Sequence, residues 1–267
     1  MDRSSRGAAC ESWTLALVMC PTAPQPVGVV EQGSIRSGYL IITPDANSTL
    51  PSPTVTFGIV NNGVVQAQAG VTPIPSITDG SLFVDVIPSS NRNLGVALVN
   101  PGTSSNVVTL TLRDVTGAPV GSAVSITLAA HQQIARFVTE LFPAGTAGNT
   151  FTGSLRLQGA SPFGVLGLRF SGTEFSTSPV GVSAAGTDAN ATITLPQFAL
   201  GGGWGTQLAL VNNGPSGSSG RIDVFDPSGN PMAVQLNGAL QSSFTYSIAP
   251  GGTFALAPRD MNGLSPF

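Results

Sequence analysis

The chain has 267 residues, and only 9% of them are charged, against about a quarter in an average soluble protein. All ten basic residues are arginine and the formal net charge is −3, which argues against a nucleic-acid partner because that binding needs a clustered basic face. With 41% hydrophobic residues the chain is too apolar for compositional disorder, and no apolar run is long enough to span a membrane.

Residues 1–33 are interpreted as a leader that holds an export signal and a first edge strand. Arg3 and Arg6 precede the short apolar stretch 13–20, which has the form of a signal-peptide core but no clear cleavage site after it. Both cysteines of the chain, Cys10 and Cys20, lie in this region. They form a disulfide in an oxidising compartment or remain two unpaired thiols, and the sequence leaves both alternatives open. The low charge suits an extracellular or cell-surface location.

Residues 34–143 follow as a first copy of a β-rich unit. Alternation of apolar and polar residues in 108–112 and 124–128 predicts strands with one buried and one wet face. Turn residues such as Asp114 and Gly117 separate the runs. A single helix-like stretch occurs near 137–142 and ends at a proline. The expected strands are 38–43, 55–60, 64–70, 81–87, 94–100, 107–114, 122–128 and 132–138.

The chain then repeats itself. The tetrad Ala-Leu-Val-Asn at 97–100 recurs at 209–212, and the same offset of 112 carries Asp114 and Gly117 onto Asp226 and Gly229. We therefore expect an all-β fold, with two tandem Ig-like antiparallel β-sandwich domains related by internal duplication.

The boundaries follow from this repeat: a linker at 144–149, a second copy at 150–260 and a tail at 261–267. The second copy opens with Gly-Ser-Leu-Arg-Leu at 153–157, opposite Gly-Tyr-Leu-Ile-Ile at 38–42. An apolar run at 27–30 stands where a preceding last strand would lie. This position suggests either a longer repeat array or a unit that passes a strand to its neighbour.

Few residues suit catalysis or ligand binding. His131 is the only histidine, and it lies in a hairpin whose counterpart near Gly251 has no histidine, so we interpret it as a turn residue. No cluster or motif predicts a metal or a cofactor. Trp204 follows a run of three glycines, and its counterpart in the first copy is Arg92. It is a plug over the sheet edge or a possible ligand contact that stacks on a sugar ring.

Segments 94–101, 135–143 and 164–170, together with 196–198, 201–204 and 243–248, resemble uncharacterised tandem Ig-like β-sandwich repeat modules of secreted bacterial proteins. The resemblance covers residues 34 to 259. It implies an extracellular accessory module and brings no catalytic residues with it.

The leading hypothesis is a non-enzymatic extracellular module with a structural, adhesive or self-assembling role. Its partners would be other protein subunits, in a homo-oligomer or filament, or cell-surface components. The alternative is a carbohydrate-binding accessory module that holds polysaccharide through Trp204. A third hypothesis, a hydrolase with a dispersed site, would need His131.

Overall fold

The fold is taken from a computed structural model, which describes residues 37–49, 51–61, 64–71, 73, 76–143, 145–146, 150–182, 192–259 and 265. The leader 1–33, both Cys10 and Cys20, and all of the tail 261–267 except one residue lie outside the described residues.

Antiparallel strands make up nearly all of the regular structure, which confirms the expectation of a β-rich chain with almost no helix. The helical elements are α1 (Val138–Leu141), where the sequence predicts one, and a 3₁₀ turn, η1 (Pro88–Ser90). The strands are β1 (Val55–Asn61), β2 (Val64–Val71), β3 (Ile77–Val86), β4 (Arg92–Val99), β5 (Asn106–Asp114), β6 (Val124–Leu128), β7 (Gln133–Phe137), β8 (Phe151–Ser171), β9 (Glu174–Ser178), β10 (Gly181–Val182), β11 (Leu208–Val211), β12 (Ser218–Asp223), β13 (Val234–Leu236), β14 (Ala239–Gln241), β15 (Ser243–Ile248) and β16 (Thr253–Leu256).

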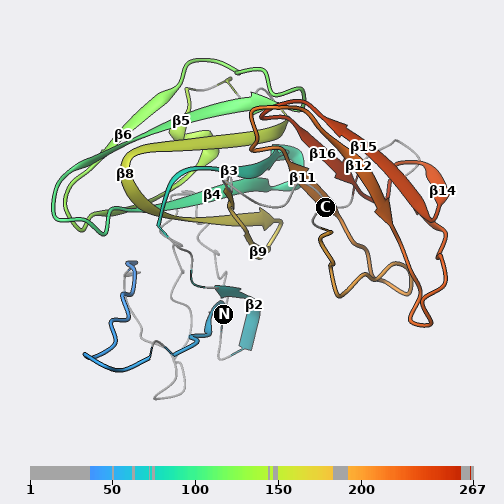
Figure 1. Ribbon diagram of the computed structural model, residues 1–267, viewed down its shortest axis with the longest axis horizontal. Helices are drawn as coiled ribbons and strands as arrows, with labels where there is room; N and C mark the ends of the chain where they lie inside the picture. The colour runs from blue at the N-terminus through green and yellow to red at the C-terminus, as the bar shows by residue number, and fades with distance from the viewer. Residues whose placement is uncertain are drawn as a thin grey trace, which may run out of the picture.

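Residues 77–182 form what we call the large unit, and β8 organises it. Figure 1 shows β8 folding back on itself, so its two halves lie in two layers. The first half pairs with β3 on one side and β5 on the other. The second half pairs with β4 and β9. The strand orders are therefore β10-β3-β8-β5-β6 in one layer and β7-β4-β8-β9 in the other.

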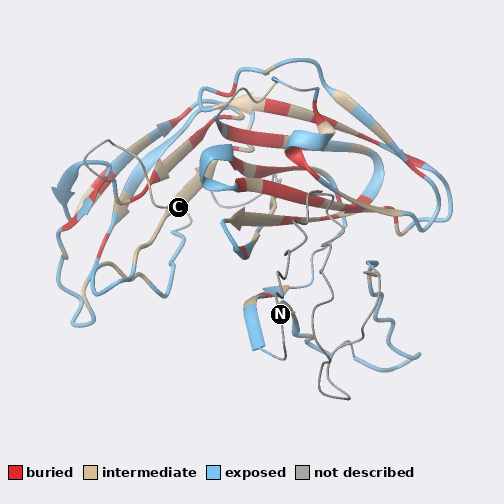
Figure 2. Ribbon diagram, turned by 180° about the vertical axis from the view of Figure 1, so that it is seen from behind, coloured by how far each residue is buried: buried red, intermediate tan, exposed pale blue. Residues whose placement is uncertain are grey.

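The core of the large unit lies between these two layers. Alternate residues of each strand point inward, as the period of a strand requires. Leu155 and Leu157 in the first half of β8 are completely buried, and they share one apolar cluster with residues from β3, β4 and β5. Figure 2 shows the buried segments concentrated on these strands. All twelve of the largest side chains with less than 2% exposure lie between residues 82 and 163.

Residues 192–259 form the small unit, drawn in orange and red beside the large unit in Figure 1. It consists of three separate two-stranded sheets, β11-β16, β12-β15 and β13-β14. Its apolar cluster has five buried members, Val224, Val234, Leu236, Phe244 and Leu256. This core is much smaller than the core of the large unit.

Two pairs of strands have the same register in both units. The pair β4-β7 corresponds to β11-β16, and the pair β5-β6 corresponds to β12-β15. In both cases the residue numbers differ by 112 in the first strand of the pair and by 120 in its partner strand. The matching pairs are Leu98↔Ile134 with Leu210↔Phe254, Val99↔Gln133 with Val211↔Thr253, Asn106↔Leu128 with Ser218↔Ile248, and Leu110↔Val124 with Ile222↔Phe244.

The corner that joins these strands also recurs. Asn100 and Asn212 are buried, and each side-chain amide donates to three carbonyl oxygens while its Oδ1 accepts the N–H two residues later. The acceptors are the carbonyls of Ser104, Leu128 and Ala129 for Asn100 (2.8, 3.2 and 2.9 Å), and those of Ser216, Ile248 and Ala249 for Asn212 (2.7, 3.1 and 3.2 Å). The Ala-Leu-Val-Asn repeat therefore marks a strand followed by a buried amide that closes a corner.

β8 follows the predicted linker at 144–149, yet it pairs with strands that precede that linker. Its residues 151–159 and 163–171 hydrogen-bond to β3, β4 and β5, all of which belong to the first copy expected from the sequence. The first element of the predicted second copy therefore completes the layers built by the first copy.

Contacts between the turn 115–117 and the turn 249–252 join the two units. The N–H of Thr253 donates to the carbonyl of Val115 at 3.0 Å, and the Ser154 hydroxyl on β8 donates to the carbonyl of Gly251 at 2.9 Å. A Cβ on Gly117 would fall on the carbonyl of Pro250. The units therefore pack directly against each other at this junction.

Residues 37–71 precede the large unit, and we call them the N-terminal segment. It consists of a stretch at 37–43 without regular secondary structure and the hairpin β1-β2. The strand expected at 38–43 is therefore not formed in the single chain. Phe57 on β1 stacks on Phe175 of β9 with ring centroids 5.1 Å apart. The Tyr39 hydroxyl donates to the carbonyl of His131 at 3.3 Å. Figure 1 shows the described part of this segment, in blue, outside the two layers of the large unit.

Candidate functional site

The candidate interaction surface is formed by the free edges of β11 and β12 in the small unit. In the large unit, β4 lies between β7 and β8, and β5 lies between β6 and β8. In the small unit, β11 pairs with β16 and β12 pairs with β15. No other described strand hydrogen-bonds to β11 or β12, although β11 lies close to β3 of the large unit. The position that β8 fills in the large unit is therefore vacant among the described residues of the small unit.

The burial of the two units reflects this difference. On β5, the inward residues Val108, Leu110 and Leu112 are completely buried. Their counterparts on β12 and just after it are Gly220, which is exposed, Ile222, which is half-buried, and Val224, which is buried. Likewise all four residues of β11 are half-buried, whereas β4 carries five buried residues. Unpaired backbone groups beside a half-covered apolar layer are the features that allow an additional strand to bind.

Trp204 lies in a tight turn that precedes β11 in the chain. The N–H and carbonyl groups of Gly201 and Trp204 bond to each other at 2.9 and 3.0 Å, and Gly201, Gly202 and Gly203 all have positive φ. This run of left-handed residues requires glycine. Trp204 is 72% exposed, so the expected role as a plug over the sheet edge is wrong. An exposed indole beside an open sheet edge can stack on a flat ligand or on another chain.

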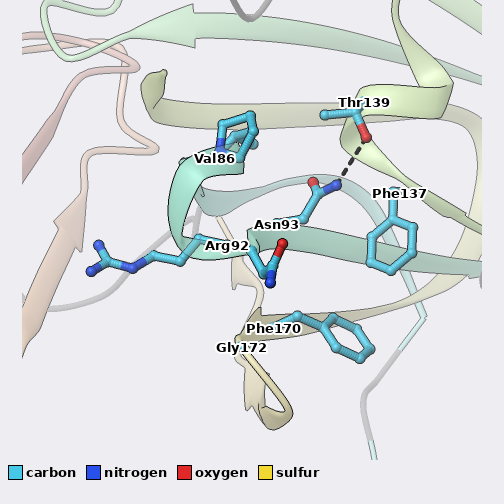
Figure 3. A pocket seen from close by; sticks show the side chains of 9 residues that line it. Val86, Arg92, Asn93, Phe137, Thr139, Phe170 and Gly172 are labelled. Atoms are coloured by element: carbon cyan, nitrogen blue, oxygen red, sulfur yellow. Dashed lines mark hydrogen bonds between the residues drawn. The ribbon is translucent and has the colours of Figure 1, made fainter. Parts of the chain in front are cut away.

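A cavity of about 330 Å³ lies at one end of the large unit. Figure 3 shows the rings of Phe137 and Phe170 forming its wall, 5.3 Å apart and edge to face, with the Asn93 amide donating to the Thr139 hydroxyl at 2.8 Å. Arg92 is the one ionisable residue of the lining, and its guanidinium points away from the two rings. The cavity therefore offers aromatic and amide contacts and no acid–base pair.

The guanidinium of Arg92 belongs instead to a buried charge cluster. Asp85 on β3 accepts from Arg92 at 3.4 Å and from Arg169 on β8 at 2.9 Å, and the Thr152 hydroxyl donates to its other oxygen at 3.3 Å. The Asp85 and Arg92 side chains are each 5% exposed. One carboxylate on β3 thus binds residues of β4 and of both halves of β8, which is a structural role for these charges.

His131 has the positive φ of a turn residue, as does its counterpart Gly251. Its N–H donates to the carbonyl of Gly102 at 3.2 Å, and no hydrogen bond to its imidazole is found within the described residues. The described part of the chain holds no group of three histidine, cysteine, aspartate or glutamate residues that could bind a metal. None of its helices is long and apolar enough to cross a membrane.

Sequence reasoning found Trp204 and the repeated corner, but it missed the free edges of β11 and β12. The sequence offers a signal in the alignment of residues 38–42 with the start of β8, although 38–42 form no strand in the single chain. Comparisons with protein-family models, curated proteins and solved structures find no match for the chain.

Proposed function

We propose that this protein is a non-enzymatic, extracellular structural module that assembles with other protein subunits through its sheet edges. The observation that carries the proposal is the vacant strand position of the small unit. Among the described residues, it leaves one edge of β11 and one edge of β12 without a hydrogen-bonded strand, next to the partly buried apolar residues Leu208 and Ile222. Such an edge tends to pair with a further strand unless charge or a bulge blocks it.

The proposal also holds that the two units are related copies, which the shared strand register and the two asparagine corners support. The two units are copies of one Ig-like design, and the second copy is completed by material from outside itself. A chain with only 9% charged residues also gives little electrostatic repulsion between its copies. Modules of this kind serve as parts of an array at the cell surface or outside the cell.

Size-exclusion chromatography with light scattering tests this function on the full chain. We expect a mass that rises above the 27.0 kDa of one chain as the concentration increases and, in electron micrographs, elongated assemblies. A mass of one chain at every concentration would refute the self-assembling role.

A carbohydrate-binding accessory module is the second candidate, and the 72% exposure of Trp204 favours it. Sugar rings stack on such an exposed indole face. Pull-down on insoluble polysaccharides should then retain the chain, and Trp204→Ala should abolish the retention. Ser228→Ala, on an exposed turn of the same unit, is the matched control. Retention that Trp204→Ala does not change would exclude this site.

A further inference from the structure

We propose that the N-terminal segment of one copy of this chain fills the vacant strand position in the small unit of another copy, so that the chains join head to tail. This inference rests on the proposed self-assembling function and names the element that performs it.

The large unit defines what the vacancy requires. There β8 enters between β3 and β5 with Leu155 and Leu157 inward and Arg156 outward, folds back, and runs along β4 to a hairpin with β9. The small unit has counterparts of β4 and β5, so a chain that completes it needs two inward apolar residues two positions apart. It then needs a fold-back and a second strand that ends in a hairpin.

The N-terminal segment has these features in this order. Leu40 and Ile42 stand at the positions of Leu155 and Leu157, and Ile41 stands at the position of Arg156. The hairpin β1-β2 follows, and the end pairs Asn61↔Val64 and Ser171↔Glu174 show that β1-β2 and β8-β9 are each closed by two intervening residues. The stretch between 43 and β1 is longer than the bend of β8, which leaves more chain for the fold-back.

The apolar side chains at positions 40–42 of this segment are exposed in the single chain. Leu40 is 81% exposed and Ile42 is 48% exposed, while their counterparts on β8 are completely buried. Adjacent large apolar residues exposed to this extent mark an interaction site when they lie on an extended chain. The segment therefore has an unburied apolar face, and the small unit has a half-covered core that this face would complete.

The segment is also held in the correct place for donation. Ser154 on β8 donates to the carbonyl of Gly251 in the following unit. Tyr39 stands at the position of Ser154 in the N-terminal segment and donates to the carbonyl of His131, the counterpart of Gly251. The segment thus lies against the large unit as β8 lies against the small unit. A second copy that places its small unit over this segment would continue the same arrangement.

The contact that results joins two different surfaces, the N-terminal segment of one chain and the small unit of the next. Such a heterologous contact does not saturate in a dimer, and it extends into a filament unless it closes into a ring. It also changes the surroundings of Trp204. In the large unit, the counterpart Arg92 pairs with Ser171 at the end of β8 and is buried, so completion of the small unit should bury Trp204.

Leu40→Arg and Ile41→Arg form a matched pair for the test, because both side chains are exposed in the single chain. Arginine at position 41 reproduces the outward Arg156, whereas arginine at position 40 would enter the core of the small unit. We expect Leu40→Arg to weaken association about a hundredfold or more, because it buries an unpaired charge, and Ile41→Arg to leave association nearly unchanged. With Trp13 replaced by phenylalanine so that Trp204 alone emits, tryptophan emission should shift to shorter wavelength as assemblies form, and the shift should be lost when Leu40→Arg is added.

The measurement is light scattering over a concentration series, with circular dichroism to show that each variant is folded. Assembly of Leu40→Arg equal to that of Ile41→Arg would overturn strand donation and leave the self-assembling function standing. Absence of assembly in the unchanged chain would overturn both.

Discussion

Gly117 and Gly229 occupy the same position in the two recurring turns, and alanine at each of them measures how firmly the units pack together. Each glycine donates its N–H to the carbonyl of the aspartate three residues earlier, at 3.0 and 2.9 Å, and each has a positive φ, 88° and 86°. Alanine in this left-handed region costs about 1–2 kcal/mol at either site. Only at Gly117 would the added methyl collide with the Pro250 carbonyl of the small unit, while the space at Gly229 is open.

We therefore expect Gly229→Ala to lower the free energy of unfolding by about 1–2 kcal/mol. Gly117→Ala should lower it by a further amount of about 1–3 kcal/mol, the usual cost of overpacking. Urea denaturation followed by circular dichroism gives the two values. Hydrogen exchange should show faster opening of residues 249–253 in Gly117→Ala alone. Equal costs, with unchanged exchange in 249–253, would refute direct packing between the units.

Three further predictions concern the interior and the turns. Asn100→Ala removes the donor that three carbonyls share and should lower the free energy of unfolding by roughly 3 kcal/mol, measured by urea denaturation. A loss below about 1 kcal/mol would contradict the buried corner. Asn212→Ala should raise hydrogen exchange only within residues 192–259. Asp85→Asn removes the charge that two arginines share and should cost about 3–5 kcal/mol; a neutral result in the same assay would show that the cluster is dispensable. The pKa of Asp114 is lowered first by the hydroxyl of Thr116 and then by backbone N–H groups, and the pKa of Asp226 is lowered first by the backbone N–H of Asn230. Because the pKa of each carboxyl is lower in the folded than in the unfolded chain, the stabilisation that the two turns contribute is present above about pH 4. It is lost as the pH falls through the pKa values of the folded chain. The urea midpoint should therefore be lower at pH 3 than at pH 7, and an Asp114→Asn, Asp226→Asn double variant should reduce that difference; an unchanged difference would contradict this role of the two turns.

The local pattern of the sequence was sufficient to predict most of the antiparallel strands, the short helix at 138–141 and the corners that follow Val99 and Val211, but the strand expected at 38–43 is absent from the single chain. These features depend on alternation and turn chemistry, which neighbouring residues carry. The pairing partners of β8 were not predictable in the same way. A sequence repeat looks the same whether the first strand of each copy pairs with strands of its own copy or with strands of the preceding copy. The offset between the copies therefore does not reveal which strands β8 pairs with.

The role of Trp204 was also beyond the sequence, for a related reason. Its exposure depends on whether a strand covers the edge of β11, and that is a property of long-range pairing. The buried counterpart Arg92 lies against Ser171 of β8, while Trp204 has no described strand in that place. The same residue position is therefore core in one unit and surface in the other.

Cross-linking between two populations of chains tests strand donation most directly. In the large unit, Thr109 on β5 pairs with Gln158 on β8, and the corresponding positions are Arg221 on β12 and Thr43 in the N-terminal segment. Chains that carry Thr43→Cys, with Cys10 and Cys20 replaced by serine, are mixed with tagged chains that carry Arg221→Cys on the same background. Ser228→Cys in place of Arg221→Cys is the control.

The account predicts a disulfide-linked product of one tagged and one untagged chain under mild oxidation, formed with Arg221→Cys and far less with Ser228→Cys. Absence of this product, or equal yields with the two partners, would contradict the claim that the N-terminal segment of one chain completes the small unit of the next.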